Sequence, residues 1–169
     1  MQNSSAFFYL LVYFTHGSFF LSHPWYFCSS SQLRLLRLVC CYGISDEGMS
    51  EAAAKLPLLE ELDITLCPLL KESLEAVGHC CPLLKSIKWN QQWYAAYGLS
   101  QIKCNEEAVA IAKNMPELRH LQIIENKLRN DGLLAILDGC PQLESLDLRK
   151  CFHVTLSRNL GKYAERIKV

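Results

Sequence analysis

Four similar phrases, each opening on a proline, recur along the sequence and decide the fold that it specifies. They read Pro57-Leu-Leu-Glu-Glu-Leu-Asp-Ile64, Pro82-Leu-Leu-Lys-Ser-Ile-Lys-Trp89, Pro116-Glu-Leu-Arg-His-Leu-Gln-Ile123 and Pro141-Gln-Leu-Glu-Ser-Leu-Asp-Leu148. The prolines are separated by 25, 34 and 25 residues, which indicates a repeat of about 25 residues with one nine-residue insertion. An earlier copy, Ser31-Gln-Leu-Arg-Leu-Leu-Arg-Leu38, lacks only the proline.

All five copies fit the leucine-rich template L-x-x-L-x-L-x-x-N/C-x-L. Its positions are filled in turn by Leu33, Leu36, Leu38 and Cys41; Leu59, Leu62, Ile64 and Cys67; Leu84, Ile87, Trp89 and Gln92; Leu118, Leu121, Ile123 and Asn126; Leu143, Leu146, Leu148 and Cys151. Residues two apart point to the same face of a strand, so each copy is predicted to begin with a short strand.

The second half of each copy carries apolar residues at helical spacing. The predicted helices are 46–56, 71–80, 106–115 and 130–138, and Gly78 and Gly139 are expected to end two of them. One strand and one helix cannot bury a core alone, so the copies are expected to stack. The predicted fold is an α/β leucine-rich-repeat solenoid, a right-handed horseshoe arc of about five repeats with a parallel concave sheet.

The domain organisation follows from a break in composition near residue 30. Residues 1–30 hold ten of the 17 aromatic residues and no Lys, Arg, Asp or Glu. Their apolar run, 6–14, is too short to span a bilayer and no basic residue precedes it, so neither a membrane helix nor a signal peptide is favoured. We expect this segment to lie outside the fold, with an N-terminal cap as the alternative. Residues 31–169 form the predicted repeat domain, with an insertion at about 90–105.

Charge and cysteine usage narrow the function classes. The 169 residues carry 17 basic and 17 acidic side chains, so neither nucleic acid nor an anionic membrane is an expected partner. Of the nine cysteines, Cys81 and Cys140 fill the apolar position before a proline, and Cys41, Cys67 and Cys151 fill the N/C position of the template. Five thiols therefore have packing roles, which favours a reducing compartment, cytoplasmic or nuclear.

Catalysis, metal binding and cofactors are not expected. Candidate zinc ligands are Cys140, Cys151 and His153, or His79 with Cys80 and Cys81, but a zinc site would need four converging ligands. A Cys80 nucleophile with His79 as its base is also disfavoured, because adjacent residues on a helix do not face each other. Phosphate-loop, dinucleotide-loop and zinc-protease motifs are absent from the sequence.

Two groups of residues are candidate partner-binding sites. Strand alternation predicts ten side chains on the solvent side of the concave face: Arg37, Val39, Asp63, Thr65, Lys88, Asn90, Gln122, Ile124, Asp147 and Arg149. Their mixed charges suit a protein or peptide partner better than a polyanion. The insertion adds Trp93, Tyr94 and Tyr97, residue types enriched at interface hot spots, although these rings could equally pack against the repeats. Trp89 occupies a template position and is expected in the core.

A family resemblance rests on the repeats and their cysteines. The phrases Leu36-Arg-Leu-Val-Cys-Cys-Tyr-Gly-Ile-Ser-Asp-Glu-Gly-Met49, Gly78-His-Cys-Cys-Pro82 and Asp138-Gly-Cys-Pro-Gln-Leu-Glu-Ser-Leu-Asp-Leu-Arg-Lys-Cys151 resemble the cysteine-containing repeats of plant F-box/LRR-repeat proteins. The resemblance extends over roughly residues 31–168. It implies a module that recruits a protein substrate to an SCF-type E3 ubiquitin ligase.

The same resemblance implies an F-box that binds a Skp-type adaptor. An F-box opens with a Leu-Pro phrase and acidic residues, and neither precedes Ser31, so adaptor binding is not expected of this chain. The alternative function is a secreted or cell-surface leucine-rich-repeat binding protein, with Asn3-Ser4-Ser5 as a glycosylation acceptor.

Overall fold

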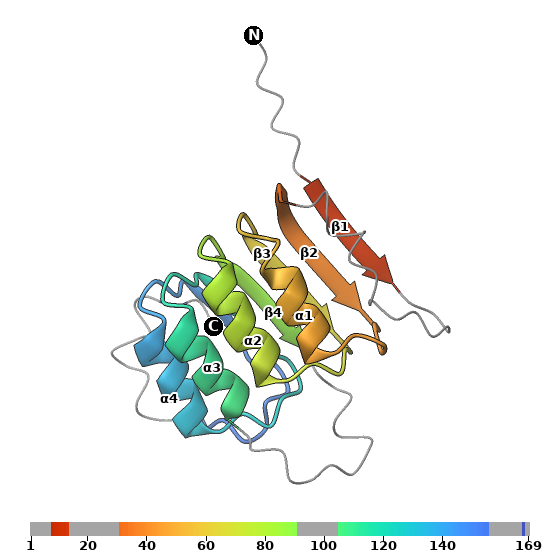
Figure 1. Ribbon diagram of the computed structural model, residues 1–169. Coiled ribbons are helices and arrows are strands. Elements are labelled where there is room, and N and C mark those ends of the chain that lie inside the picture. The colour runs from red at the N-terminus through yellow and green to blue at the C-terminus, as the bar shows by residue number, and fades with distance from the viewer. Residues whose placement is uncertain (1–7, 14–30, 91–104, 156–166, 168–169) are drawn as a thin grey trace.

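A computed structural model describes residues 8–13, 31–90, 105–155 and 167. Six parallel strands form one sheet in chain order. The strands are β1 (Phe8–Tyr13), β2 (Leu33–Val39), β3 (Glu61–Thr65), β4 (Ser86–Asn90), β5 (His120–Gln122) and β6 (Ser145–Asp147). Four helices stack side by side against one face of this sheet (Figure 1): α1 (Asp46–Ala53), α2 (Lys71–Cys80), α3 (Glu106–Asn114) and α4 (Asn130–Gly139).

The predicted α/β leucine-rich-repeat solenoid is confirmed. Neighbouring repeats align in register, so that Leu62 of β3 lies opposite Leu36 of β2 on one side and Ile87 of β4 on the other. The apolar template positions of every repeat strand therefore fall on the helix-covered face, where they belong to one continuous core. Trp89 belongs to this core, with 1% of its surface exposed. Leu148, the equivalent template residue of the last repeat, is partly buried and packs against this core.

The turn after each described repeat strand has a shared geometry. The residue before the N/C position has a positive φ in all four described turns: Cys40 (55°), Leu66 (55°), Glu125 (56°) and Lys150 (63°). The cysteine that follows can then donate its S–H to a backbone carbonyl, as Cys67 does to Leu38 O at 3.5 Å and Cys151 does to Ile123 O at 3.1 Å. The packing role predicted for these cysteines is confirmed.

Burial also confirms the role of the position before each proline. Leu56, Cys81, Met115 and Cys140 are all buried in the common core. Burial raises the pKa of the Cys81 thiol to about 12. All seven cysteines in the described ranges are free thiols, so no disulfide links the repeats there.

Some details differ from the sequence predictions. Gly78 does not end its helix but lies inside α2. A glycine is needed there because Asn114 of α3 occupies the adjacent space and leaves no room for a side chain. Helix α1 stops at Ala53, short of residue 56, and residues beyond it form a turn. Strand β1 falls within residues 1–30 and pairs with β2, although we expected that segment to lie outside the fold. The domain boundaries stay a prediction.

Candidate binding surface on the concave face

The solvent-facing side of the sheet brings the predicted concave residues together in rows. Cα pairing places Arg37 beside Asp63, Asp63 beside Lys88, Lys88 beside Gln122 and Gln122 beside Asp147. A second row contains Val39, Thr65 and Asn90, while Ile124 and Arg149 come just after β5 and β6. All of these side chains are half-buried except that of Arg149, which is exposed.

Asp63 is the centre of the first row. Its carboxylate forms an ion pair with Arg37, with Nε and Oδ2 2.8 Å apart, and a longer one with Lys88, with Nζ and Oδ2 3.9 Å apart. The Thr65 hydroxyl donates to Asp63 Oδ1 at 3.0 Å. Two cations from the flanking strands thus share one carboxylate, and this group of three charged side chains carries a net charge of +1.

Amide and hydroxyl groups link the second row to the next repeat. Asn90 donates through Nδ2 to Thr65 Oγ1 at 3.4 Å, and its Oδ1 accepts the backbone N–H of Ile124 at 3.2 Å. The Asn90 side chain therefore spans repeats on both sides. This contact fixes the amide while leaving the row half-exposed.

At the C-terminal end of the face, Arg149 folds back onto Asp147. Its Nε and Nη2 donate to Asp147 Oδ1 at 3.0 Å and Oδ2 at 2.8 Å. This hydrogen-bonded pair lowers the pKa of Asp147 and raises that of Arg149. Because 73% of the Arg149 side chain is exposed, it remains accessible to a partner.

A further charged row lies at the N-terminal ends of β2–β6, with its first member inside β2 and the other four just before their strands, and the sequence analysis missed it. It consists of Arg34, Glu60, Lys85, Arg119 and Glu144, joined in that order by backbone hydrogen bonds of 2.8–2.9 Å. Glu60 pairs with Arg34 on one side and with Lys85 on the other, with Lys85 Nζ and Glu60 Oε2 3.4 Å apart, and Arg119 pairs with Glu144 at 3.1 Å. The signal was available, since the residue after the first template leucine is charged in all five copies.

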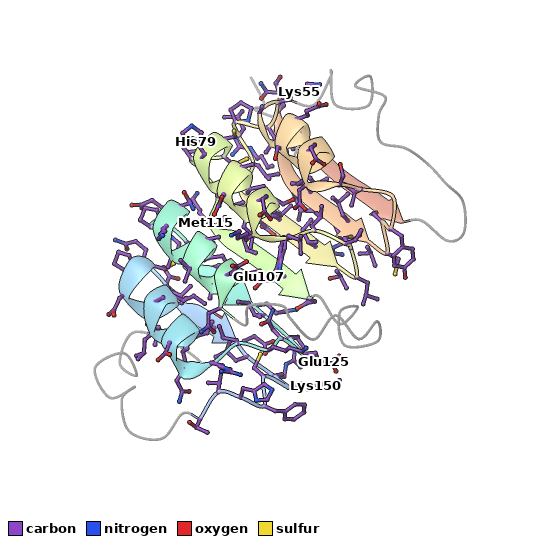
Figure 2. All side chains as sticks on the ribbon, turned by 60° about the horizontal axis from the view of Figure 1, so that its bottom comes forward. Lys55, His79, Glu107, Met115, Glu125 and Lys150 are labelled. Atoms are coloured by element: carbon purple, nitrogen blue, oxygen red, sulfur yellow. The ribbon has the colours of Figure 1, made fainter. Side chains whose placement is uncertain are left out.

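The turns beyond the strands add one more ion pair. Lys150 and Glu125 lie together after β6 and β5 and form a salt bridge (Figure 2). The remaining predicted site residues, Trp93, Tyr94 and Tyr97, lie outside the described residues.

Within residues 8–13, 31–90, 105–155 and 167, no three His, Cys, Asp or Glu side chains gather as metal ligands. Neither proposed zinc set is therefore assembled there. The described helices include none that is long and apolar enough to cross a membrane.

Comparison with known proteins gives relatives for most of the chain. No family model matches it. It is 44% identical over 165 residues to "Putative F-box/LRR-repeat protein 23" of Arabidopsis thaliana, covering 91% of this chain and 36% of that protein. It is 48% identical over 141 residues to "F-box protein SKIP19" of the same plant, covering 83% of this chain and 44% of that protein. The chain thus spans less than half the length of either relative.

Proposed function

We propose that this chain, which resembles the plant F-box/LRR-repeat proteins over most of its length, is a protein-interaction module. In this proposal it is the substrate-recognition part of an SCF-type E3 ubiquitin ligase, in the pathway of protein ubiquitination and degradation. It binds a target protein or peptide, acts in the cytoplasm or nucleus, and performs no chemistry itself. Its likeness to several F-box/LRR-repeat proteins supports the class.

The observation that carries the proposal is the character of the concave face. Five repeats present rows of half-buried polar and charged side chains of both signs, with carboxylates shared between cations of neighbouring strands. A fixed pattern of alternating charge selects partners by electrostatic complementarity. In our proposal the insertion residues Trp93, Tyr94 and Tyr97 extend this surface.

The test is capture of partner proteins from plant extract by the immobilised chain, followed by cross-linking and mass spectrometry. Reversing charge with Lys88→Glu and Arg149→Glu should reduce capture of concave-face partners by about tenfold or more, the size expected for rim and core charges of an interface. The melting temperature should change little, because both side chains are substantially exposed and surface ion pairs contribute about 0–1 kcal/mol.

A matched control separates local from overall charge. Lys55→Glu with Lys113→Glu makes the same change in net charge but places it after α1 and in α3. Equal capture by the wild-type protein and the Lys88/Arg149 variant would contradict the proposal. A separate pull-down with a purified Skp-type adaptor tests the expectation that this chain does not bind the adaptor.

A further inference from the structure

An excess of positive charge lies on the central strands β4 and β5 and on the residue just before each of them. Residues 85–90 and 119–124 contain Lys85, Lys88, Arg119 and His120 and no Asp or Glu. We call these four residues the basic strip. Cα pairing aligns β4 with β5, and the backbone carbonyl of Lys85 accepts the N–H groups of both Arg119 and His120, so the four residues are neighbours across two adjacent strands.

The carboxylates near the strip neutralise it only in part: Arg119 pairs with Glu144 at 3.1 Å, whereas Lys85 and Lys88 each share a carboxylate with a second cation. Glu60 is shared between Lys85 and Arg34, and Asp63 is shared between Lys88 and Arg37. In the Asp63 group the short contact of 2.8 Å goes to Arg37, whereas Lys88 Nζ stands 3.9 Å from the carboxylate. Glu60 and Asp63 thus each serve two cations, and the unbalanced charge in these two groups lies on the β4 side.

The cations of the strip are accessible. The exposed fractions of the Lys85, Lys88 and Arg119 side chains are 49%, 43% and 49%, and His120 is also exposed. Beside them, Ser86, Asn90 and Gln122 provide half-buried hydrogen-bonding groups on the same face. Lys85 and Lys88, which are exposed and share their carboxylates with other cations, can therefore accept further carboxylates.

The width of the strip restricts the shape of the ligand. Acidic residues border it on both sides, with Glu61 and Asp63 on β3 and Glu144 and Asp147 at β6. Adjacent strands are about 4.8 Å apart, so the positive region is only about two strands wide. A single extended chain fits this width, whereas the two backbones of a nucleic-acid duplex would meet the flanking carboxylates.

The remainder of the chain offers no acidic segment to occupy the strip. Of the 17 Asp and Glu residues, Glu165 alone lies outside the described ranges. The insertion at 91–104, which directly follows β4, contains Lys103 and no acid. The undescribed residues of this sequence therefore hold no acidic cluster that could cover the strip.

We infer that the basic strip binds an extended acidic peptide segment of a partner protein, with Asp and Glu side chains placed over β4 and β5. This inference rests on the proposed function and names the chemistry of its target. The acidic segment supplies the carboxylates that Glu60 and Asp63 do not provide in full.

The test is fluorescence anisotropy of the full chain with a labelled eight-residue peptide that alternates Glu and Gly. We expect saturable binding that weakens as salt is raised, because exposed charges are screened over about 10 Å at 0.1 M salt. The same peptide with Gln in place of Glu should not bind detectably. The double variant that carries both Lys88→Gln and Arg119→Gln should bind the Glu peptide at least tenfold more weakly than the wild-type protein.

The control variant, Lys55→Gln with Lys113→Gln, removes the same charge away from the strip and should change the affinity less than twofold. Equal weakening by both variants, no binding of the Glu peptide, or tighter binding of a single-stranded oligonucleotide of equal charge would each overturn the inference. Failure of the proposed function gives a different result, because capture of partner proteins would then survive Lys88→Glu with Arg149→Glu. If the Lys88→Glu, Arg149→Glu variant loses that capture but the wild-type protein does not bind the Glu peptide, the proposed function stands and only the inference of an acidic ligand is overturned.

Discussion

Glu107 is an acidic residue at a position where the other repeats have small side chains. Counting from the buried residue before each proline, its equivalents are Gly48, Ser73 and Gly132. Ser73 is fully buried, and a side chain at Gly132 would meet Asn105, so this position is crowded in those two repeats. Glu107 is half-buried in the first turn of α3 (Figure 2), and burial raises the pKa of its carboxyl, with the nearby carboxylates of Glu106 and Glu72 adding to the effect.

Glu107→Gln should stabilise the protein at pH 7. Because the folded-state pKa is raised, the folded protein binds more protons than the unfolded chain between the two pKa values, and the free energy of unfolding falls as pH rises through that window. The neutral amide avoids this loss. Urea denaturation at several pH values should show that the advantage of the variant shrinks as pH falls to about 4, near the ordinary pKa of Glu. A constant difference across this range would contradict the assignment.

Helices α2 and α4 pack closely against α3 because each has a glycine at its contact with α3. A Cβ built at Gly78 of α2 would lie 2.6 Å from Asn114 Cβ, and one at Gly139 of α4 would lie 2.4 Å from Ala112 O. The neighbouring atoms include backbone, which cannot rotate away. These glycines therefore set how closely adjacent helices approach, and the apolar residues behind them depend on that distance for their packing.

Gly139→Ala should destabilise the fold by about 1–3 kcal/mol, the usual range for overpacking, because α4 must shift away from α3. Gly48→Ala is the matched control within α1: its Cβ would meet Ser45 Oγ at an ordinary 3.6 Å, so it should be neutral or stabilising by up to about 1 kcal/mol. Chemical denaturation measures both. Similar losses in the two variants would show that helix propensity rather than packing controls the result.

At the scale of the whole molecule, a side-chain oxygen at the start of a helix connects one repeat to the next. Asp46 Oδ1 accepts the N–H of Leu70 at 2.9 Å, and the amide oxygens of Asn105 and Asn130 accept backbone N–H groups 24 and 25 residues further on. In the second repeat this position is Lys71, which forms an ion pair with Glu106, with Nζ and Oε2 3.5 Å apart. Since each repeat contacts its neighbours, such links act at single interfaces.

Asp46→Ala should therefore loosen the first interface more than the others. It removes the acceptor of the Leu70 and Ser73 N–H groups and of the buried Ser73 hydroxyl, at a cost of about 1–3 kcal/mol. Hydrogen exchange should accelerate in β2 and α1 while α4 keeps its protection. Asp46→Asn retains an acceptor, as Asn105 and Asn130 do, and should restore protection. Uniform acceleration along the chain would argue against independent interfaces.

Much of the fold could be predicted from the sequence because its signals are local. The period of about 25 residues, the strand at each template phrase and the four helices all follow from apolar spacing within one repeat. Burial of Trp89 and of the cysteines at template positions followed in the same way. Gly78 was misassigned because glycine at a helix end and glycine at a helix contact look alike in a single sequence.

For the candidate site, alternation predicted which strand residues face solvent on the concave side, and the row that includes Arg37, Asp63 and Lys88 is aligned as expected. The row that contains Lys85 and Arg119 was missed because four of its five members precede their strands, where alternation does not apply. The roles of Trp93, Tyr94 and Tyr97 stay a prediction.

The sequence by itself determined the repeat, the core and the outward rows, since each depends on periodicity within a few neighbouring residues. The tertiary structure decided which charges share a partner, which repeats are linked at their helix starts and where glycine is required. These properties depend on atoms about 25 residues apart, and parallel strand register brings them together to within hydrogen-bonding distance. The unbalanced charge of the basic strip results from that register.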